Sequence, residues 1–541
     1  MMRVTYLVNG KKVSTSKSNK DLLINVEKNN ERVTYKVKAL SDVTLVKAKE
    51  LIDLRVNFHD VYFLNGYQSW TDTREYALAK RLRNIRKSPH IISHMFAMDK
   101  YGDAPFYRYA ANRSHGYDIF YSKGKNSSFI YNLNYKNAYL IVELTKSNLP
   151  NFCRTHLISD VENITLKKDE EFVLFDYKYF HSYEEGMKAF EEDFPLQPTK
   201  KIFGYTSWYN YYQNINEEII LRDLKALDCR FNVFQIDDGY ESFVGDWLNV
   251  DEKNFPHGLK PIVEEIHKYG YKAGIWLAPF AVEEKSKTFA EHPDWIKKDE
   301  KGHPIKCGGN WSGFYSLDLS KQEAVDYVKD CLNHYIDLGF DFFKLDFLYC
   351  VGLGKYEGLS RSQVQERAYQ LLRDVLKDKI ILGCGANIIN SYGKFDYLRI
   401  GPDVSLSFDD AWFMRMFHRE RVSTKVTIQN TIFRSFMNRR LFGNDPDVFL
   451  LRDENIKLNE NQKIALAAIN ALFGSILMTS DNIATYNEHQ NQLLEQVFGL
   501  FYHSKVTGYS IKRNIITINY LCKDKPNTLK YNLKKGVLEN A

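Results

Sequence analysis

The pattern of apolar and polar positions divides the chain into three parts, and the first is rich in short alternating runs. From residue 1 to about 197, runs such as 32–37, 139–144 and 172–177 alternate apolar with polar side chains, between clusters of Asn, Ser, Gly and Lys. A period of two is typical of strands with one buried face. The pattern therefore predicts an N-terminal β-sandwich over 1–197. It ends in a linker that contains Pro195 and Pro198.

The second part, 198–488, alternates strand-like apolar runs with amphipathic helices. The predicted helices are 217–227, 259–268, 321–338 and 461–472, and the predicted strands are 202–205, 231–238, 271–276, 342–347, 380–384, 397–400 and 474–478. Repeated βα units over such a length favour a (β/α)₈ TIM barrel. A doubly wound sheet is the alternative, but the sequence lacks the Gly-rich first turn that such sheets use.

The third part, 489–541, predicts a small C-terminal antiparallel β domain. Residues 506–509 predict a turn, and the β-branched run 515–520 predicts a strand. A multidomain protein also follows from the length of 541 residues, because single hydrophobic cores stop growing at about 250–300 residues.

Composition narrows the possible classes of function. The net charge of +6 is small for this length, and only the run 80–87 concentrates cations. That run could bind an anion, although a solvated surface fits it better. The sequence has no phosphate-binding loop or arginine-rich arm, so we expect no nucleic-acid partner. The seven Cys show neither metal-site nor redox spacing, which is typical of reduced thiols in a cytosolic protein. The sequence also shows no signal peptide and no apolar run of about 18 residues. We therefore expect a cytoplasmic protein with no membrane contact.

The run 342–347 is the clearest candidate for a functional strand. It is almost wholly apolar except for Lys344 and Asp346, which share one face because strand side chains alternate. If that face points into the mouth of a barrel, the Lys344 ammonium lies one layer of side chains below the Asp346 carboxylate. The structural alternative is a buried Lys–Asp ion pair that only fixes the strand.

Chemistry-bearing residues recur at the ends of the predicted strands, where barrel active sites are built. They are Trp208, Asp237, Asp238, Trp276, Lys344, Asp346, Cys384, Arg399 and Asp403. The sequence shows no metal-ligand spacing and no nucleophile elbow, so carboxylate chemistry on a hydroxyl-rich substrate is favoured.

Glycoside hydrolysis needs two carboxyl groups with opposed tasks, one ionised and one holding a proton. Asp346 suits the ionised role because Lys344 favours its charged form. Asp403 follows a Gly401-Pro402 turn that could aim it across the mouth. From the residues alone, an isomerase or a non-catalytic sugar binder fits about equally well.

Six motifs in order resemble glycoside hydrolase family 36, the family of microbial α-galactosidases. The resemblance is strong over about 200–480, and Gly66-Tyr67-Gln68-Ser69-Trp70 extends it to the N-terminal part. The motifs are Gly204-Tyr205-Thr206-Ser207-Trp208-Tyr209, Gln235-Ile236-Asp237-Asp238-Gly239-Tyr240, Gly274-Ile275-Trp276-Leu277-Ala278-Pro279-Phe280, Lys344-Leu345-Asp346-Phe347, Leu382-Gly383-Cys384-Gly385 and Arg399-Ile400-Gly401-Pro402-Asp403.

The resemblance implies a retaining, exo-acting α-galactosidase that acts on small galacto-oligosaccharides by double displacement. By motif match, Asp346 is the nucleophile and Asp403 the acid/base. Asp237 and Asp238 match residues that bind the O4 and O6 side of galactose. The remaining substrate-binding matches are Lys344, Arg399, Trp208, Trp276, Cys384 and, from the N-terminal part, Trp70. No cofactor and no metal are implied, and the oligomeric state stays open.

The chain departs from the family pattern at a few positions. Tyr205 and Thr206 stand where relatives often carry Trp and Cys, and Tyr67 precedes Gln68. After Asp403 the chain continues with a segment that is not the commonest continuation in the family. In it, Asp409 and Asp410 could compete for the acid role, line the leaving-group side or cap a helix. The alternatives are an α-galactosyl transferase, a related α-glycosidase including one for N-acetylgalactosamine, and a weakly catalytic sugar-binding protein.

Overall fold

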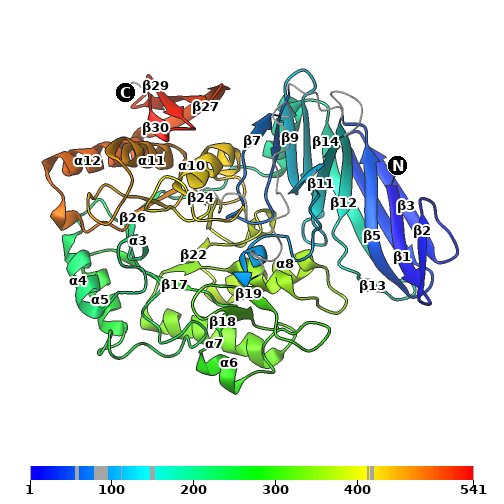
Figure 1. Cartoon of the computed structure of the whole chain (residues 1–541), viewed down its shortest axis with the longest axis horizontal. Helices are drawn as coiled ribbons and strands as arrows, with labels where there is room; N and C mark the ends of the chain where they lie inside the picture. Colours follow the sequence, from blue (N-terminus) through cyan, green and yellow to red (C-terminus); the bar gives the residue numbers. More distant parts are fainter. Residues whose placement is uncertain are drawn as a thin grey trace.

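The structure is a computed structural model that describes residues 2–54, 60–77, 95–110, 112–146, 153–410, 414 and 419–539. Two large antiparallel sheets form the N-terminal part, a helix-covered parallel sheet the central part, and a small sheet lies over helices α11 and α12 (Figure 1). The cationic run 80–87 and Trp412 lie outside the described residues. Within those residues, no helix is both long and apolar enough to cross a bilayer.

The N-terminal part consists of two antiparallel sheets with a shared apolar core. Val4 and Leu45 of one sheet and Val37 and Leu174 of the other are fully or almost fully buried in one cluster, as alternation predicts. One sheet holds β1 (Met2–Val8), β2 (Lys11–Thr15), β5 (Val43–Ile52), β8 (Arg113–Tyr117), β11 (Leu140–Lys146), β12 (Cys153–Ser159) and β13 (Thr165–Leu166); the other holds β3 (Leu22–Asn29), β4 (Arg32–Ala39), β6 (Val61–Leu64), β7 (Glu75–Ala77), β9 (Ile119–Lys123), β10 (Ser128–Asn132) and β14 (Glu171–Phe180).

The central part is a curled parallel sheet. Its strand order is β24-β23-β22-β21-β17-β16-β15-β26-β25. The edge strands β24 and β25 are separated in the chain only by Pro446 and Asp447, so the two ends of the sheet come together. The strands are β15 (Ile202–Thr206), β16 (Val233–Ile236), β17 (Lys272–Leu277), β21 (Phe342–Leu345), β22 (Ile380–Gly383), β23 (Tyr397–Arg399), β24 (Gly443–Asp445), β25 (Val448–Phe449) and β26 (Ile476–Thr479).

Helices connect these strands, and side-chain caps fix where several of them begin. Ser360 and Gln363 form a capping box at α8, as do Asn459 and Gln462 at α11, which satisfies amide groups that the first turn leaves open. The α-helices here are α2 (Tyr183–Asp193), α3 (Trp208–Tyr211), α4 (Glu217–Ala226), α5 (Lys260–Lys268), α6 (Lys287–Glu291), α7 (Gln322–Leu338), α8 (Arg361–Leu376), α10 (Thr424–Phe433), α11 (Glu460–Phe473) and α12 (Glu488–His503).

Short elements complete the part of the chain that the structure describes. A small antiparallel sheet β18-β20-β19 is inserted between β17 and α7. Its strands are β18 (Ala281–Glu283), β19 (Lys306–Gly308) and β20 (Phe314–Ser316), and the 3₁₀ helices are η1 (Met98–Lys100), η2 (Leu348–Leu353), η3 (Ile389–Ser391), η4 (Ser435–Met437) and η5 (Ile483–Thr485).

The C-terminal sheet corrects one prediction. It contains β27 (Ser504–Lys512), β28 (Ile515–Cys522), β29 (Lys525–Asn532) and β30 (Val537–Leu538). The predicted turn at 506–509 is wrong, because these residues lie inside β27. The register shifts there between Val506 and Gly508, so the glycine marks a β-bulge and not a turn. The chain turns instead at Arg513 and Asn514, between paired Lys512 and Ile515.

The coarse prediction of the fold is confirmed: a multidomain chain with antiparallel sheets around a curled parallel βα sheet. Most predicted elements are present within one or two residues of their expected bounds, for example α7 at Gln322–Leu338 and β17 at Lys272–Leu277. The eightfold count of a complete barrel and the domain boundaries at 197 and 488 stay predictions.

Candidate active site

A cavity of 470 Å³ opens beside the carboxyl ends of the central strands, where sites in parallel βα folds are built. Eight of the ten predicted site residues line it: Trp70, Trp208, Asp237, Asp238, Trp276, Lys344, Asp346 and Asp403. Arg399 and Cys384 lie behind the wall. The structure therefore brings together side chains that span more than 300 positions of the sequence.

Asp346 follows the last residue of β21 and is held by two donors. Trp276 Nε1 donates to its Oδ2 at 3.0 Å, and the backbone N–H of Phe347 donates to its Oδ1 at 2.8 Å. Phe347 has a φ of 54°, which is costly for a bulky residue and is often found at functional sites. This backbone conformation turns the chain sharply behind the carboxylate.

Burial raises the pKa of Asp346 to about 6. The nearby Lys344 and the Trp276 hydrogen bond lower it, and the charge of Asp403 raises it. The prediction that Lys344 favours the charged form has the right direction, but desolvation outweighs it. Asp346 is therefore ionised at neutral pH and becomes protonated in mildly acidic solution.

Lys344 forms a buried ion pair with Asp237 and not with Asp346. Its Nζ lies 2.8 Å from Asp237 Oδ2, which also accepts from Gln235 Nε2 at 2.6 Å and Thr206 Oγ1 at 3.1 Å. Burial alone would lower the pKa of Lys344, but the Asp237 charge raises it above its ordinary value. The alternative of a buried Lys–Asp ion pair is thus right in that Lys344 forms such a pair. The pair, however, lies on the wall of the cavity.

Asp238 is fixed by two side chains that sequence reasoning did not single out. Trp311 Nε1 donates to its Oδ2 at 2.8 Å and Gln213 Nε2 to its Oδ1 at 3.0 Å. Burial, with the neighbouring Asp237, raises the pKa of Asp238. Glu241 is buried beside it, and burial together with the Asp238 charge raises the pKa of Glu241 well above its usual range. This carboxyl group was also missed.

Trp311 carried a signal that could have identified it. It lies in Gly308-Gly309-Asn310-Trp311-Ser312-Gly313, where three glycines frame a single aromatic residue between β19 and β20. Its φ of 53° is unusual for a tryptophan, and tertiary contacts hold it, including the Asp238 hydrogen bond. A glycine-rich loop that presents one large side chain is therefore a sequence signal for a site residue.

Asp403 lies on a more open side of the cavity. Arg399 Nη1 donates to its Oδ1 at 2.9 Å, and its side chain is 34% exposed. Arg399 itself is buried, since it also binds Asp445 at 2.7 Å and Asp447 at 2.9 Å. Burial raises the pKa of Asp447 to about 7 although Arg399 lowers it. Arg399 therefore acts on the cavity through Asp403 and does not line it.

The predicted aromatic and thiol residues fall into two groups. Trp208, Trp276 and Trp70 line the cavity, and Trp70 packs edge-on against Phe347 with ring centroids 5.1 Å apart. Trp70 is held over the central sheet because Ser69 N–H donates to Ala386 O at 2.9 Å. Cys384 is fully buried, its backbone N–H donates to Leu345 O at 2.7 Å, and it does not line the cavity.

The outer rim of the cavity comes from segments that no motif marked. Phe96, Met98, Asp410, Glu420 and Arg421 line it. Burial raises the pKa of Glu420 to about 7, while the adjacent Arg419 lowers it. Thr71 donates to Glu420 Oε1 at 2.8 Å. The rim thus adds a carboxyl group that is partly protonated near neutral pH.

Asp409 and Asp410 take different positions. Asp409 accepts from Ser423 Oγ at 2.7 Å, and Arg421 lies 3.5 Å from its Oδ1. Ser423 caps the N-terminus of α10. Asp409 therefore belongs to the support of this helix, whereas Asp410 faces the cavity.

Comparison with known proteins finds similarity in the central part of the chain. Residues 198–377 match the family model described as Melibiase. The chain is similar to α-galactosidases of glycoside hydrolase family 36. An α-galactosidase of Escherichia coli is 29% identical over 195 residues, which are 34% of this chain and 27% of that protein. The match thus spans about a quarter of the length of this curated relative.

Two solved structures share the fold of the chain. TtGalA, an α-galactosidase from Thermus thermophilus in complex with p-nitrophenyl α-D-galactopyranoside, has a TM-score of 0.70 at 23% identity, over 97% of this chain and 98% of that one. A variant of the family 36 α-galactosidase AgaA from Geobacillus stearothermophilus, in complex with raffinose, has a TM-score of 0.62 at 11% identity, over 94% of this chain and 73% of that one. The comparisons confirm the predicted resemblance to family 36. The enzyme class, a glycoside hydrolase, belongs to the proposal below.

Proposed function

We propose that the chain is a retaining, exo-acting α-galactosidase that removes terminal α-linked galactose from small oligosaccharides. The observation that carries the proposal is one cavity with two differently held carboxyl groups, Asp346 and Asp403. The solved relatives hold an aryl α-galactoside and raffinose, so galactosides are the substrate class that the similarity favours.

In this proposal Asp346 is the nucleophile. Two fixed donors hold its carboxylate, which leaves it little freedom to rotate before it attacks the anomeric carbon. The bond between the anomeric carbon and the leaving oxygen breaks as the new bond to Asp346 forms. The product of this step is a β-linked glycosyl-enzyme.

Asp403 is the acid and then the base. It donates a proton to the leaving oxygen in the first step and takes one from water in the second. Its 34% exposed side chain suits this role, because the leaving group must depart and water must enter on that side. Its contact with Arg399 fixes the side chain from behind.

Asp237 and Asp238 are proposed to bind the hydroxyl groups on the far side of galactose. Both are buried on the cavity wall with donors already attached, and their remaining acceptor capacity can take up sugar hydroxyls. An axial O4 and an equatorial O4 point in different directions, so fixed acceptors at this position separate galactosides from glucosides.

The proposal is tested by hydrolysis of aryl α-galactoside, α-glucoside and α-N-acetylgalactosaminide, with wild type, Asp346→Ala and Asp403→Ala. We expect turnover of the galactoside only, and a loss of about 10⁴-fold or more in Asp346→Ala. Azide should restore turnover in both variants. It should give a β-galactosyl azide with Asp346→Ala, because azide replaces the nucleophile, and an α-galactosyl azide with Asp403→Ala, because azide attacks the glycosyl-enzyme.

Glu420→Gln is the matched control for the acid/base role. It should keep wild-type turnover of the aryl galactoside without azide. If Glu420→Gln gives the α-azide and Asp403→Ala does not, the acid/base role belongs to Glu420. Absence of turnover on all three substrates, with binding of galactose intact, would leave a sugar-binding protein in place of an enzyme.

A further inference from the structure

The loop 309–313 joins β19 to β20 and places Trp311 in the wall of the candidate active-site cavity. A tight turn presents this residue, because Gly313 N–H donates to Asn310 O at 2.8 Å and Trp311 has a φ of 53°. Such a backbone conformation is costly for a bulky residue and persists only where surrounding contacts hold it. The contacts that hold the loop therefore decide where the Trp311 indole lies.

On one side, the loop is held by the central part of the molecule. The hydroxyl and the backbone N–H of Ser312 donate to Glu283 Oε2 at 2.8 Å and 3.2 Å. Glu284 N–H donates to Gly313 O at 3.0 Å. These contacts fix the end of the loop that leads into β20.

On the other side, the loop is held by Tyr101 of the N-terminal part. Gly309 N–H donates to the Tyr101 hydroxyl at 2.9 Å, and this hydroxyl donates to Asn310 Oδ1. Gln68 Nε2 in turn donates to Tyr101 O at 2.9 Å. A Cβ at Gly308 would lie 2.9 Å from the Tyr101 hydroxyl, so the absence of a side chain there allows the close approach.

Trp311 connects the two ends of the inner wall. Its Nε1 donates to Asp238 Oδ2 at 2.8 Å. Its ring packs against Phe347 and Trp276, with centroids 4.9 Å and 6.1 Å away. These two residues are the donors that hold Asp346. The position of Trp311 therefore fixes the Asp238 carboxylate relative to the Asp346 carboxylate.

The Asp238 carboxylate has little acceptor capacity left for a ligand. Trp311 occupies Oδ2, and Gln213 Nε2 donates to Oδ1 at 3.0 Å. Burial raises the pKa of Glu241 well above its usual range, and this protonated carboxyl group forms a further hydrogen bond with Asp238. A carboxylate offers about four lone-pair positions, so about one remains for a sugar hydroxyl. Its direction is set by the donors that orient the carboxylate.

We propose that Trp311 is a specificity-determining residue, whose indole N–H turns Asp238 toward one hydroxyl group of the sugar ring, and that Tyr101 is the positioning residue that holds Trp311 there. In the proposed function Asp238 binds galactose, and the role of Trp311 rests on that assignment. The N-terminal part then takes part in sugar selection through contacts that run from Tyr101 to the loop and from Trp311 to Asp238.

Titration calorimetry tests the role of Trp311 in the Asp346→Ala protein, where binding is measured without turnover. The ligands are p-nitrophenyl α-galactoside and its 4-deoxy and 6-deoxy forms. We expect removal of either hydroxyl group to weaken binding about tenfold. With Trp311→Phe added, the weakening should fall below about threefold for one deoxy ligand and stay for the other, because Asp237 keeps its ion pair with Lys344.

Tyr101→Phe tests the positioning role, because it removes the hydroxyl that holds the loop and keeps the ring. It should reduce the weakening for the same deoxy ligand, and it should have no further effect on that ligand once Trp311→Phe is present. Since Tyr101 also lines the cavity, independent effects of the two substitutions would mean that Tyr101 contacts the sugar itself, and the positioning role would be rejected. Tyr101→Phe also decides the proposal if Trp311→Phe does not fold.

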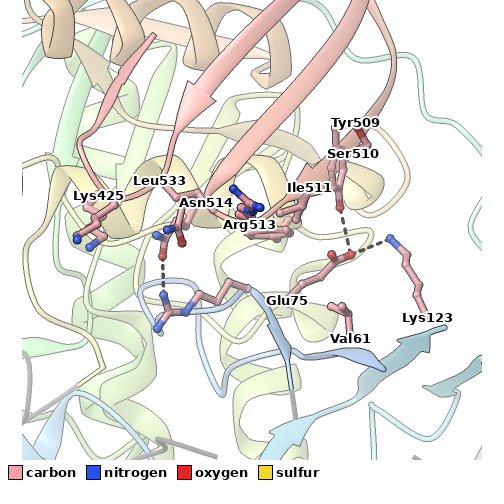
Figure 2. Close-up of a pocket in the computed structure, with 14 residues that line it drawn as sticks. Val61, Glu75, Lys123, Lys425, Tyr509, Ser510, Ile511, Arg513, Asn514 and Leu533 are labelled. Atoms are coloured by element: carbon pink, nitrogen blue, oxygen red, sulfur yellow. Dashed lines mark hydrogen bonds and ion pairs between the residues drawn. The ribbon is translucent and has the colours of Figure 1, made fainter. Parts of the chain in front are cut away.

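A second contact between parts of the molecule supplies the matched control. At a separate cavity of 590 Å³, the hydroxyl of Tyr509 in β27 lies 3.5 Å from Glu75 Oε1, which also accepts from Lys123 Nζ at 2.7 Å (Figure 2). Among the described residues, the two cavities have no lining residue in common. Tyr509→Phe removes the same group from this contact and should leave the affinity for all three ligands unchanged.

Two results would overturn the proposal. One is intact binding of the galactoside with both deoxy ligands weakened as before in Trp311→Phe, which would make Trp311 a wall residue only. The other is an equal effect of Tyr509→Phe and Tyr101→Phe, which would indicate a general loosening between the parts. Failure of the proposed function looks different, because the complete galactoside would then not bind to the Asp346→Ala protein, and the role of Trp311 would be rejected with it.

Discussion

The inner wall and the outer rim of the candidate active-site cavity are built on different principles. On the inner wall, Asp237, Lys344 and Asp346 come from strand ends, and each is fixed by a hydrogen bond or ion pair of 3.0 Å or less. On the rim, Asp410, Glu420 and Arg421 come from the long connection between β23 and α10. The wall is a preorganised network at strand ends, whereas these three rim residues lie outside the named helices and strands.

The difference indicates which residues should control the proposed reaction and which should control the choice of substrate. A network of buried charges tolerates little change, because removing one partner leaves the other buried and unpaired. A loop surface can change in sequence at small cost and alter which leaving group is accepted. We therefore expect changes on the inner wall to abolish turnover and changes on the rim to alter selectivity.

The largest effect is expected for Lys344→Met. The variant leaves Asp237 buried without its ion pair, which should destabilise the fold by about 3–5 kcal/mol. It should lower kcat/KM on an aryl galactoside at least about a hundredfold, since the wall that is proposed to bind the sugar loses its fixed geometry. Chemical denaturation and steady-state kinetics measure the two effects.

Lys297→Met is the control for this prediction, because Lys297 forms another buried ion pair, 3.3 Å from Asp318, and does not line the cavity. It should lose stability and keep kcat/KM. The double variant Lys344→Met with Asp237→Asn should recover stability without recovering activity. Equal activity in Lys344→Met and wild type would mean that the ion pair only fixes the strand.

Most of the inner wall was predictable because strand ends follow from sequence periodicity. A buried run ends in a carboxylate at Asp346, and another ends in Asp237; parallel strands bring such ends to one edge. The pairing of Lys344 with Asp237 was not predictable. It joins β21 with the residue after β16, and β17 lies between these two strands in the sheet, so no pairing of adjacent strands indicates the contact.

The rim could not be predicted for a different reason. Glu420 and Arg421 lie in a segment without periodicity, and nothing local distinguishes them from solvated loop residues. Trp311 is an intermediate case, since its glycine-rich surroundings were visible but not its contact with Asp238. The Arg513 turn was masked by the misassigned turn at 506–509, because a glycine in a strand and a glycine in a turn look alike.

The second prediction concerns the pH dependence of turnover and tests whether the inner wall sets the pKa of Asp346. Since burial raises the pKa of Asp346 to about 6, and the proposed nucleophile must be ionised, kcat/KM should fall about tenfold per pH unit below pH 6. The charge of Asp403 contributes to this raised value. In Asp403→Asn the acidic limb should therefore move to lower pH.

An aryl galactoside with a good leaving group is the substrate for this measurement, because its departure does not require a proton from Asp403. Asp410→Asn serves as the control and should leave the acidic limb in place. An acidic limb that stays at the wild-type position in Asp403→Asn would show that the two carboxylates do not interact across the cavity.

The smallest effect is expected on the rim, for Asp410→Asn. In the proposed mechanism Asp403 marks the leaving-group side, and Asp410 lines the cavity on the same segment of chain. The variant should change kcat/KM about three- to tenfold for raffinose, whose leaving group is large, and leave an aryl galactoside unaffected. Asp409→Asn is the matched control, because Asp409 accepts from the Ser423 cap and should lower Tm without changing the ratio of the two substrates. If Asp410→Asn instead reduces turnover of both substrates as strongly as Lys344→Met, the rim belongs to the reaction chemistry, and the distinction between wall and rim is wrong.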